Sequence, residues 1–541
     1  MENVLALDLR PDNGVPLHQQ VYEQIRAAIL AGRVRSRQKL PSSRQLASSL
    51  NLSRTTVTQS YDQLISEGYL ETRRGAGTFV CAQVPDALLS LDAHKGAPLS
   101  LTGTLPPRTL EGFPKADAPR NSVADEPPSF TLSTYGQRLS KTIEPPKQDP
   151  TELSFRYWRP DLNLFPVKRW QRLVNRHCAA SDRSWMTYST KAMGHWPLRE
   201  EIATYIAQSR AVRCTPEQIL ITQGTQQALG LMAQVLLEEG DAVALEDPGY
   251  LSARKIFTAH GALTFPVAVD EEGLQVNQLA QLSLNITPIK LVYVTPSHQF
   301  PTGFLMSLPR RLALLEWAQK TGSLIIEDDY DSEFRYSGRP IPALQGLDRY
   351  QRVLYVGTFS KVMFPGLRLG YVVLPPALVP VFQRAKWVCD RQSSLLHQAA
   401  LTDFIAEGQL AKHIRRMRSI YEKRRQRLID LLQEISRDLG GVEIAGDPAG
   451  LHFMARLPLN QIGCSAKQLV ARAKAQGVNL FDITPYYHPD TLFSKTSGSE
   501  KQPTRLPERS AFIFGFGGLN ETTIERAIAG IRPLFEKPSP R

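Results

Sequence analysis

The sequence predicts a multidomain protein with an N-terminal α+β winged helix-turn-helix, a long linker and a larger C-terminal α/β domain. Residues 1–82 alternate short amphipathic helical patterns and end in a strand pair that glycines interrupt. Residues 83–150 hold 11 of the 39 prolines and show no sustained apolar period. From residue 151 to 541, apolar runs alternate with helical patterns, which is typical of a parallel sheet with crossover helices.

The bulk composition is that of a globular protein. The 541 residues exceed what a single core accommodates, and 42% are hydrophobic and 21% charged. The net charge of +12 is compatible with an anionic partner, but it does not by itself identify nucleic acid.

Cysteine usage and the N-terminus favour a cytoplasmic protein. The five cysteines are odd in number and widely spaced, with no CxxC pair, which argues against a disulfide framework and against a zinc site. The chain begins without a basic leader, and no apolar run approaches 18 residues. We therefore expect neither a metal site nor a membrane span.

The first 82 residues contain three helical patterns. Apolar residues repeat at helical spacing over 17–31. A second helix begins after Pro41, where Ser42 or Ser43 is placed to cap it. After a turn, Ser53 is placed to cap a third helix over 54–67.

The third helix and the strand pair indicate DNA binding. The first turn of the helix, residues 54–58, carries short hydrogen-bonding side chains and one arginine, as a recognition helix presents to the major groove. The strand pair, 69–80, has Arg73 and Arg74 beside a glycine-containing tip and so predicts a wing. Residues 33–82 hold eight basic and three acidic residues. The alternative is a small helical adaptor whose arginines are only solvated.

Residues 83–150 are predicted to be a flexible, proline-rich linker. They are also rich in alanine, serine, threonine and glycine, a composition that does not bury a core.

In the C-terminal domain, chemically active side chains follow successive predicted strands. Asp328 and Tyr330 end the run at 324–326, and Lys361 follows the run at 353–356, with Arg368 shortly after it. An amine that forms an imine, a carboxylate that keeps a ring nitrogen protonated and an arginine for a phosphate are what pyridoxal 5'-phosphate (PLP) requires.

Two further strand ends support the same cofactor. Gly224 and Thr225 open a helix directly after the run at 219–222, and a helix N-terminus favours a phosphate dianion. Tyr250 follows the next strand, where its ring can lie on an aromatic ligand. Ligands of open α/β sheets gather at the carboxyl ends of strands. A lone lysine is usually a surface residue, but this convergence favours a cofactor site.

The motifs resemble two known families. Pro41-Ser42-Ser43-Arg44, the segment 53–57 and the segment 75–80 resemble the winged helix of GntR-type regulators. The strand-end motifs resemble fold-type I PLP-dependent aminotransferases, which carry a smaller α+β lobe, and the fusion resembles the MocR subfamily. The resemblance implies DNA contacts from Ser42, Arg44, Ser53, Arg54, Thr55, Thr56 and Gly77.

The same resemblance implies a role for each cofactor residue. Lys361 would form the Schiff base, Asp328 would pair with the ring nitrogen, Tyr330 would approach the ring hydroxyl and Tyr250 would stack. Tyr188 resembles a tyrosine that reaches the partner subunit's phosphate, although it lies one residue farther from glycine 194 than the family pattern. The implied phosphate-binding residues are Gly224, Thr225, Thr358, Ser360 and Arg368.

The sequence departs from the aminotransferases at three places. Asp328 and Tyr330 are two residues apart, as in the regulator subfamily, where aminotransferases usually space them three apart. The asparagine that usually precedes Pro-Thr-Gly is replaced, so that His298 or Gln299 would have to serve in its place. The strand at 510–517 has no arginine near Ile513, where aminotransferases bind the substrate α-carboxylate. Turnover of ordinary amino acids is therefore not expected.

We accordingly predict a PLP-dependent, DNA-binding transcriptional regulator that senses an amine, an amino acid or PLP itself. The alternative is an active aminotransferase that carries a DNA-binding module. Fold-type I sites form across a subunit interface, so a homodimer is expected. A flexible 68-residue linker spans on the order of 45 Å, which would permit a domain-swapped, head-to-tail dimer.

Overall fold

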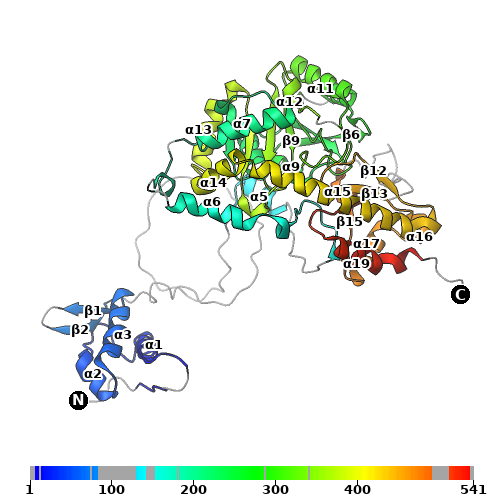
Figure 1. Ribbon diagram of the computed structural model, residues 1–541. Coiled ribbons are helices and arrows are strands. Elements are labelled where there is room, and N and C mark those ends of the chain that lie inside the picture. Colours follow the sequence, from blue (N-terminus) through cyan, green and yellow to red (C-terminus); the bar gives the residue numbers. More distant parts are fainter. Residues whose placement is uncertain are drawn as a thin grey trace, which may run out of the picture. The chain divides into compact units, whose positions relative to one another are not determined.

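The computed structural model divides into two compact units, residues 1–131 and 132–541, each described by itself (Figure 1). The described residues are 7–10, 14–73, 76–82, 130–141, 153–179, 181, 183–189, 191–285, 288–338, 341–489 and 511–536. Arg74, glycine 75 and most of the predicted linker lie outside them. No helix in the described part is both long and apolar enough to cross a membrane.

The N-terminal unit is a winged helix-turn-helix, as predicted. Its helices are α1 (Leu17–Leu30), α2 (Ser43–Ser49) and α3 (Arg54–Ser66), and its antiparallel strands are β1 (Leu70–Arg73) and β2 (Gly77–Val80). Val21, Ile25, Val57 and Leu64 are fully buried between the helices. The apolar residues at helical spacing thus form one small core.

The C-terminal unit is built on an eight-stranded sheet in the order β4-β11-β10-β9-β8-β5-β6-β7. Neighbouring strands among β10, β9, β8, β5 and β6 are parallel, whereas β11 is antiparallel to both β4 and β10. The strands are β4 (Ile219–Thr222), β5 (Ala242–Asp247), β6 (Leu263–Asp270), β7 (Gly273–Leu274), β8 (Ile289–Val294), β9 (Leu324–Asp329), β10 (Val353–Thr358) and β11 (Gly370–Val373). Every residue of β4, β5 and β10 is buried, because helices cover the sheet.

A smaller α+β lobe follows in the chain, as predicted. Its four-stranded antiparallel sheet has the order β12-β13-β16-β15, and a short parallel pair joins β14 to β3. These strands are β3 (Leu153–Ser154), β12 (Glu443–Ala445), β13 (His452–Arg456), β14 (Val478–Asn479), β15 (Phe481–Asp482) and β16 (Ala511–Gly515).

Helices surround both sheets (Figure 1). They are α5 (Thr134–Lys141), α6 (Val167–Ala179), α7 (Trp196–Arg210), α8 (Thr225–Leu236), α9 (Leu251–Ala259), α10 (Val276–Asn285), α11 (Leu308–Thr321), α12 (Leu344–Leu347), α13 (Val379–Cys389), α14 (Leu395–Ala406), α15 (Gln409–Ser436), α16 (Leu459–Ile462), α17 (Ala466–Ala475) and α19 (Glu521–Ile531).

Helix α5 corrects one detail of the linker prediction. The range 83–150 was expected to be largely unstructured, and within it residues 134–141 form a helix that packs on α9. The eight-residue segment is too short for its apolar period to stand out from the proline-rich surroundings, and its helix is stabilised by contacts with distant residues.

Candidate functional sites

A cavity of about 350 Å³ lies at the carboxyl ends of the parallel strands. It receives Tyr293 from β8, Asp328 from β9 and Thr358 from β10. Its lining comprises Tyr157, Trp158, Gly224, Thr225, Gln226, Tyr250, Ser252, Tyr293, Thr295, Phe300, Asp328, Tyr330, Thr358, Ser360, Lys361 and Arg368. The parallel register brings strand ends that lie far apart in the sequence to one edge of the sheet.

The cavity brings together nine of the ten residues that the sequence assigned to the cofactor. They are Gly224, Thr225, Tyr250, Asp328, Tyr330, Thr358, Ser360, Lys361 and Arg368. The tenth, Tyr188, does not line the cavity. Its side chain is 72% exposed and its ring lies under the Arg391 guanidinium, 5.0 Å from ring centroid to guanidinium carbon.

Asp328 presents an unpaired carboxylate oxygen in this region. Its Oδ2 accepts a hydrogen bond of 2.7 Å from the Tyr293 hydroxyl, while its buried Oδ1 has no hydrogen-bond partner among the described residues. Burial raises the pKa of Asp328 to about 7. A cationic N–H donor would satisfy Oδ1 and favour the ionised form, so the carboxylate fits a protonated pyridine nitrogen.

Lys361 lines the same cavity, and its amine is largely shielded from water. Burial lowers the pKa of Lys361 to about 8, against the carboxylates of Asp331 and Asp328, which act to raise it. The Nζ donates to the Trp158 carbonyl at 3.3 Å. A lysine with a lowered pKa has a larger fraction of neutral, nucleophilic amine near neutral pH, as reaction with an aldehyde requires.

The part of the cavity lining at the start of α8 suits a phosphate. Gly224 is the N-cap residue of α8, with φ +94° and no side-chain cap, so the first amides of the helix have no capping partner there. A Cβ atom on Gly224 would lie 3.7 Å from Nη1 of Arg368, which places the guanidinium beside this turn. The Ser360 amide donates to Thr358 Oγ1 at 3.2 Å and orders the neighbouring loop. A helix N-terminus and a guanidinium together favour a dianion.

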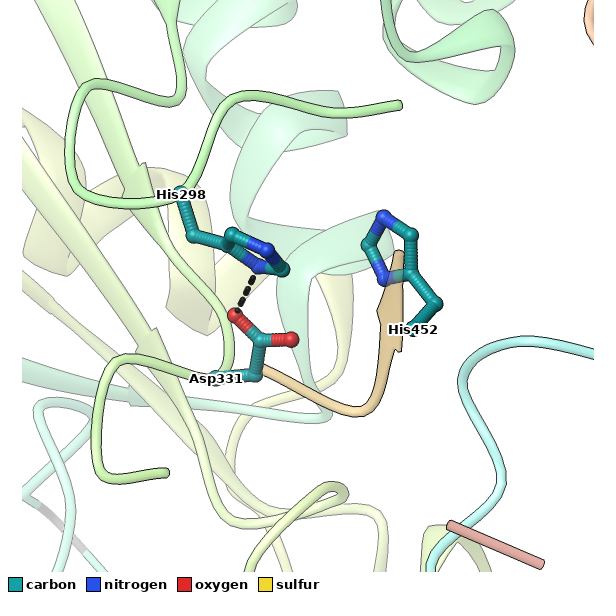
Figure 2. Close-up of side chains that lie close together, drawn as sticks. All are labelled: His298, Asp331 and His452. Atoms are coloured by element: carbon teal, nitrogen blue, oxygen red, sulfur yellow. Dashed lines mark hydrogen bonds and ion pairs between the residues drawn. The ribbon is translucent and has the colours of Figure 1, made fainter. Parts of the chain in front are cut away.

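His298, Asp331 and His452 form a buried polar cluster (Figure 2). The Tyr330 hydroxyl donates to the His298 carbonyl at 2.9 Å, and His298 Nδ1 lies 2.9 Å from Asp331 Oδ1. The second oxygen, Asp331 Oδ2, accepts from the Leu451 amide at 3.2 Å. Burial lowers the pKa of His452 to about 3, so this ring is neutral.

The three side chains of the cluster offer ligand atoms within 4.8 Å of one another. Both Asp331 oxygens are nevertheless engaged within the protein. Burial alone would raise the pKa of Asp331, but its interactions with His298, His452 and the Leu451 amide together lower that pKa. We therefore assign the cluster to holding the loop that carries Tyr330, and we assign no metal to it.

The polar loop at 295–303 does not bring the two candidate replacements for the asparagine to the cavity lining. His298 or Gln299 was expected to replace the missing asparagine, but neither side chain lines the cavity. Gln299 Nε2 donates to the carbonyls of Pro248 and Phe300 at 2.8 and 2.7 Å, and its Oε1 accepts from Thr302 Oγ1 at 2.6 Å. Its hydrogen bonds therefore hold the loop in place, and the His298 ring faces Asp331. Phe300 lines the cavity instead.

Seven lining residues were not predicted: Tyr157, Trp158, Gln226, Ser252, Tyr293, Thr295 and Phe300. Tyr293 carried a signal, because it is a polar aromatic residue within an otherwise aliphatic strand end. Tyr157 and Trp158 carried none, because they precede the first large-sheet strand by some 60 residues and reach the cavity only through the fold.

The position where aminotransferases hold a carboxylate-binding arginine is apolar in this chain. Ile513 on β16 is fully buried and packs with Tyr157 and Phe300, which both line the cavity. Arg368, at the proposed phosphate end, is the one arginine among the described lining residues.

In the N-terminal unit, the predicted DNA-binding residues lie at the starts of α2 and α3. Arg54 and Thr55 in the first turn of α3 are exposed, as is Arg44 on α2. The serines serve the helices: Ser42 Oγ accepts from the Gln45 amide at 3.2 Å, and Ser53 Oγ accepts from the Thr56 amide at 3.1 Å. The exposed arginines and Thr55 are thus the side chains with the most freedom to contact DNA.

The described part of the wing also has a specific geometry. Gly77 is exposed and has φ +113°, in the left-handed region, and a Cβ there would lie 2.9 Å from Lys39 Cε. On the facing strand, Arg73 forms an ion pair of 2.6 Å with Glu71. Gly77 therefore allows a tight turn beside a lysine.

Both parts of the chain match models of known families. Residues 17–80 match the bacterial regulatory proteins of the gntR family, and residues 160–498 match aminotransferase class I and II. A probable rhizopine catabolism regulatory protein MocR of Rhizobium meliloti is 36% identical over 98% of this chain and 96% of its own length. The chain belongs to the MocR-type GntR regulators. The pyridoxine biosynthesis regulator PdxR of Corynebacterium glutamicum is 29% identical over 97% of this chain and 98% of its own length.

Solved aminotransferases share the fold of the C-terminal unit. A kynurenine aminotransferase of Pyrococcus horikoshii has a TM-score of 0.63 at 27% identity and covers 75% of this chain and 95% of its own. The α-aminoadipate aminotransferase LysN of Thermus thermophilus, solved with a phosphopyridoxyl-leucine adduct, has a TM-score of 0.60 at 27% identity, over 75% and 94% of the chains. This MocR-type regulator is thus a DNA-binding transcriptional regulator whose aminotransferase-like domain takes PLP as its cofactor.

Proposed function

We propose that this MocR-type regulator controls transcription by sensing a primary amine, an amino acid or PLP itself in the cavity at the sheet edge. The observation that carries the proposal is that one cavity is lined both by Lys361, whose pKa is lowered to about 8, and by Asp328, whose Oδ1 has no hydrogen-bond partner among the described residues. An amine and a carboxylate in these two states fit the aldehyde and the ring nitrogen of one PLP molecule.

Nine of the sixteen lining residues then have an assigned task. PLP supplies an aldehyde that bonds reversibly to primary amines. Lys361 provides the protein's own amine, and Asp328 holds a proton on the ring nitrogen. Tyr250 stacks on the ring and Tyr330 approaches its hydroxyl. The phosphate is bound at the start of α8 by Gly224, Thr225, Thr358, Ser360 and Arg368.

The shape of the cavity also limits the ligand. Tyr157, Trp158 and Phe300 line it, and the buried Ile513 occupies the place of a carboxylate-binding arginine. A bidentate arginine would orient an amino-acid substrate, and loss of that orientation lowers reaction rates steeply. We therefore propose that transamination of common amino acids is weak or absent, which disfavours the alternative of an active aminotransferase.

The regulator is proposed to act as a homodimer in the cytoplasm, where its DNA target lies. Tyr188, Met186 and Val388 expose 72%, 63% and 85% of their surface. Arg391 lies over the rings of both Tyr188 and Trp387, so exposed apolar side chains gather in one region, as they do on contact surfaces. Tyr188 in such a contact would reach the phosphate of the neighbouring subunit.

The visible absorbance of purified protein tests the function directly. Added primary amines or amino acids should shift the absorbance band of bound PLP, and Lys361→Ala should abolish the lysine-linked band while the protein stays folded. Borohydride reduction followed by peptide mapping should mark Lys361. A mark on another lysine would contradict the assignment, and rapid turnover of common amino acids with 2-oxoglutarate would favour the aminotransferase.

A further inference from the structure

A helix within the predicted linker is seated on the C-terminal unit. Figure 1 shows α5 near α9, and the two helices are in contact. The helix begins at a serine cap, where Ser133 Oγ accepts from the Gly136 amide at 3.1 Å. No residue of α5 is buried, so its position depends on a small number of surface contacts.

Helix α5 contacts a surface of the C-terminal unit that we call the helix dock. It is formed by Glu239, His260 and Gly261. The Tyr135 ring lies 4.9 Å from the His260 ring, measured between centroids. Arg138 forms an ion pair with Glu239. A Cβ on Gly261 would come within 2.6 Å of Arg138 Nη1, so the guanidinium lies directly against this glycine.

The helix dock lies at one end of α9, and the cofactor cavity lies at the other. His260 is the C-cap residue of α9, whereas Tyr250 is its N-cap residue and lines the cavity together with Ser252. The nine residues of α9 separate the two ends by on the order of 14 Å. A single rigid element therefore contacts the cavity and the linker helix.

Hydrogen bonds also connect the cavity end of α9 to neighbouring elements. The Tyr250 hydroxyl accepts from Gln226 Nε2 at 3.1 Å, at the start of α8. Arg254 Nη1 donates to the Tyr487 carbonyl of the smaller lobe at 2.8 Å. A ligand that repositions Tyr250, or moves the smaller lobe, would thus act on α9 from the end opposite the helix dock.

We propose that the helix dock is the surface through which occupancy of the cofactor cavity controls the linker. PLP beneath Tyr250 holds α9 in the position that seats α5, and loss of that contact releases α5. With α5 released, the linker is fixed to the C-terminal unit near residue 153 and no longer at residue 133. Its maximal reach therefore grows by up to about 65 Å. The direction of the coupling rests on the proposed function, because it requires PLP to contact Tyr250.

Hydrogen exchange of peptides covering residues 130–141, in the full-length protein, tests the proposal. Addition of PLP should slow exchange in α5 several-fold. Arg138→Glu should exchange fast with or without PLP, because like charges then face each other at Glu239. The double variant Arg138→Glu with Glu239→Arg should recover the slow exchange. Lys141→Glu makes the same charge change on the same helix. Because Lys141 has no recorded ion pair with any described residue, this variant should behave like the parent.

The PLP absorbance of each variant separates two kinds of failure. If the parent takes up PLP but α5 exchange does not change, the coupling is wrong while the proposed function stands. If Arg138→Glu leaves α5 exchange as slow as in the parent, the helix dock itself is wrong. If the parent takes up no PLP, the proposed function and the coupling both fail, and the charge-reversal rescue measured without PLP still decides whether the helix dock exists.

Discussion

At the scale of single residues, burial sets the protonation of the groups that would hold PLP. Desolvation lowers the pKa of Lys361 to about 8 and raises that of Asp328 to about 7, so both move toward neutral pH. The two shifts disfavour the charged forms, and a bound cofactor would relieve both by taking up the amine and supplying a cationic partner for the carboxylate. Shifted pKa values of this kind are typical of functional sites.

Lys361 makes the capture of PLP depend on pH. The neutral amine attacks the aldehyde, and it predominates above the pKa of about 8. The rate of PLP uptake by cofactor-free protein should therefore rise with pH up to about 8 and level off above it. Stopped-flow absorbance over a pH series measures this rate. A rate that keeps rising toward pH 10 would indicate a lysine without the expected shift.

Asp328→Asn should weaken PLP retention. The substitution removes the carboxylate partner of the ring nitrogen, and a hydrogen bond to a charged group is worth about 1.5–3 kcal/mol, or roughly 10- to 100-fold in Kd. An absorbance titration with PLP measures the change. Asp438→Asn, at an exposed position of the smaller lobe, is the matched control. Equal affinities for both variants would remove Asp328 from this role.

At the scale of elements, helix ends and strand ends carry the chemistry. The N-termini of α2 and α3 present arginines, and the N-terminus of α8 with its Gly224 cap presents amides to the cavity. The capping serines could be predicted because a Ser side chain satisfies a free amide three residues on, a local interaction. The packing of α5 on α9 could not, because it joins residues more than 100 positions apart.

Arg54→Ala and Arg44→Ala should weaken DNA binding. Loss of an arginine that contacts a base edge should reduce the binding free energy by about 1–3 kcal/mol and relax sequence specificity. Loss of one that contacts phosphate should weaken binding to all sequences alike and lower the salt slope by about one. Gel shifts at several salt concentrations distinguish the two cases. Arg33→Ala, an exposed arginine after α1, controls for the lost charge. Parental binding by both variants would contradict the predicted DNA-binding surface.

At the scale of the whole molecule, the proposed homodimer can be tested through the mass of the protein in solution. Size-exclusion chromatography with light scattering should give twice the 60.5 kDa chain mass. Val388→Glu should shift the protein toward the monomer, because it places a charge on the 85% exposed apolar side chain. Leu308→Glu, on the exposed side of α11, should leave the mass unchanged. A monomer that retains PLP would contradict the homodimer.

The sequence by itself determined the order of the domains, both fold classes and nine of the ten assigned residues that meet at the cavity. The domain order and most of these residues follow from local periodicity, from helix caps and from the rule that parallel strands end at one edge of a sheet. Thr358 and Ser360 were implied only by the resemblance to fold-type I aminotransferases. Only the tertiary structure showed that Tyr157 and Trp158 line the cavity and that α5 packs on α9. It also showed that the Gln299 side chain forms hydrogen bonds within its own loop. Each of these depends on packing between segments far apart in the chain, which no local pattern encodes.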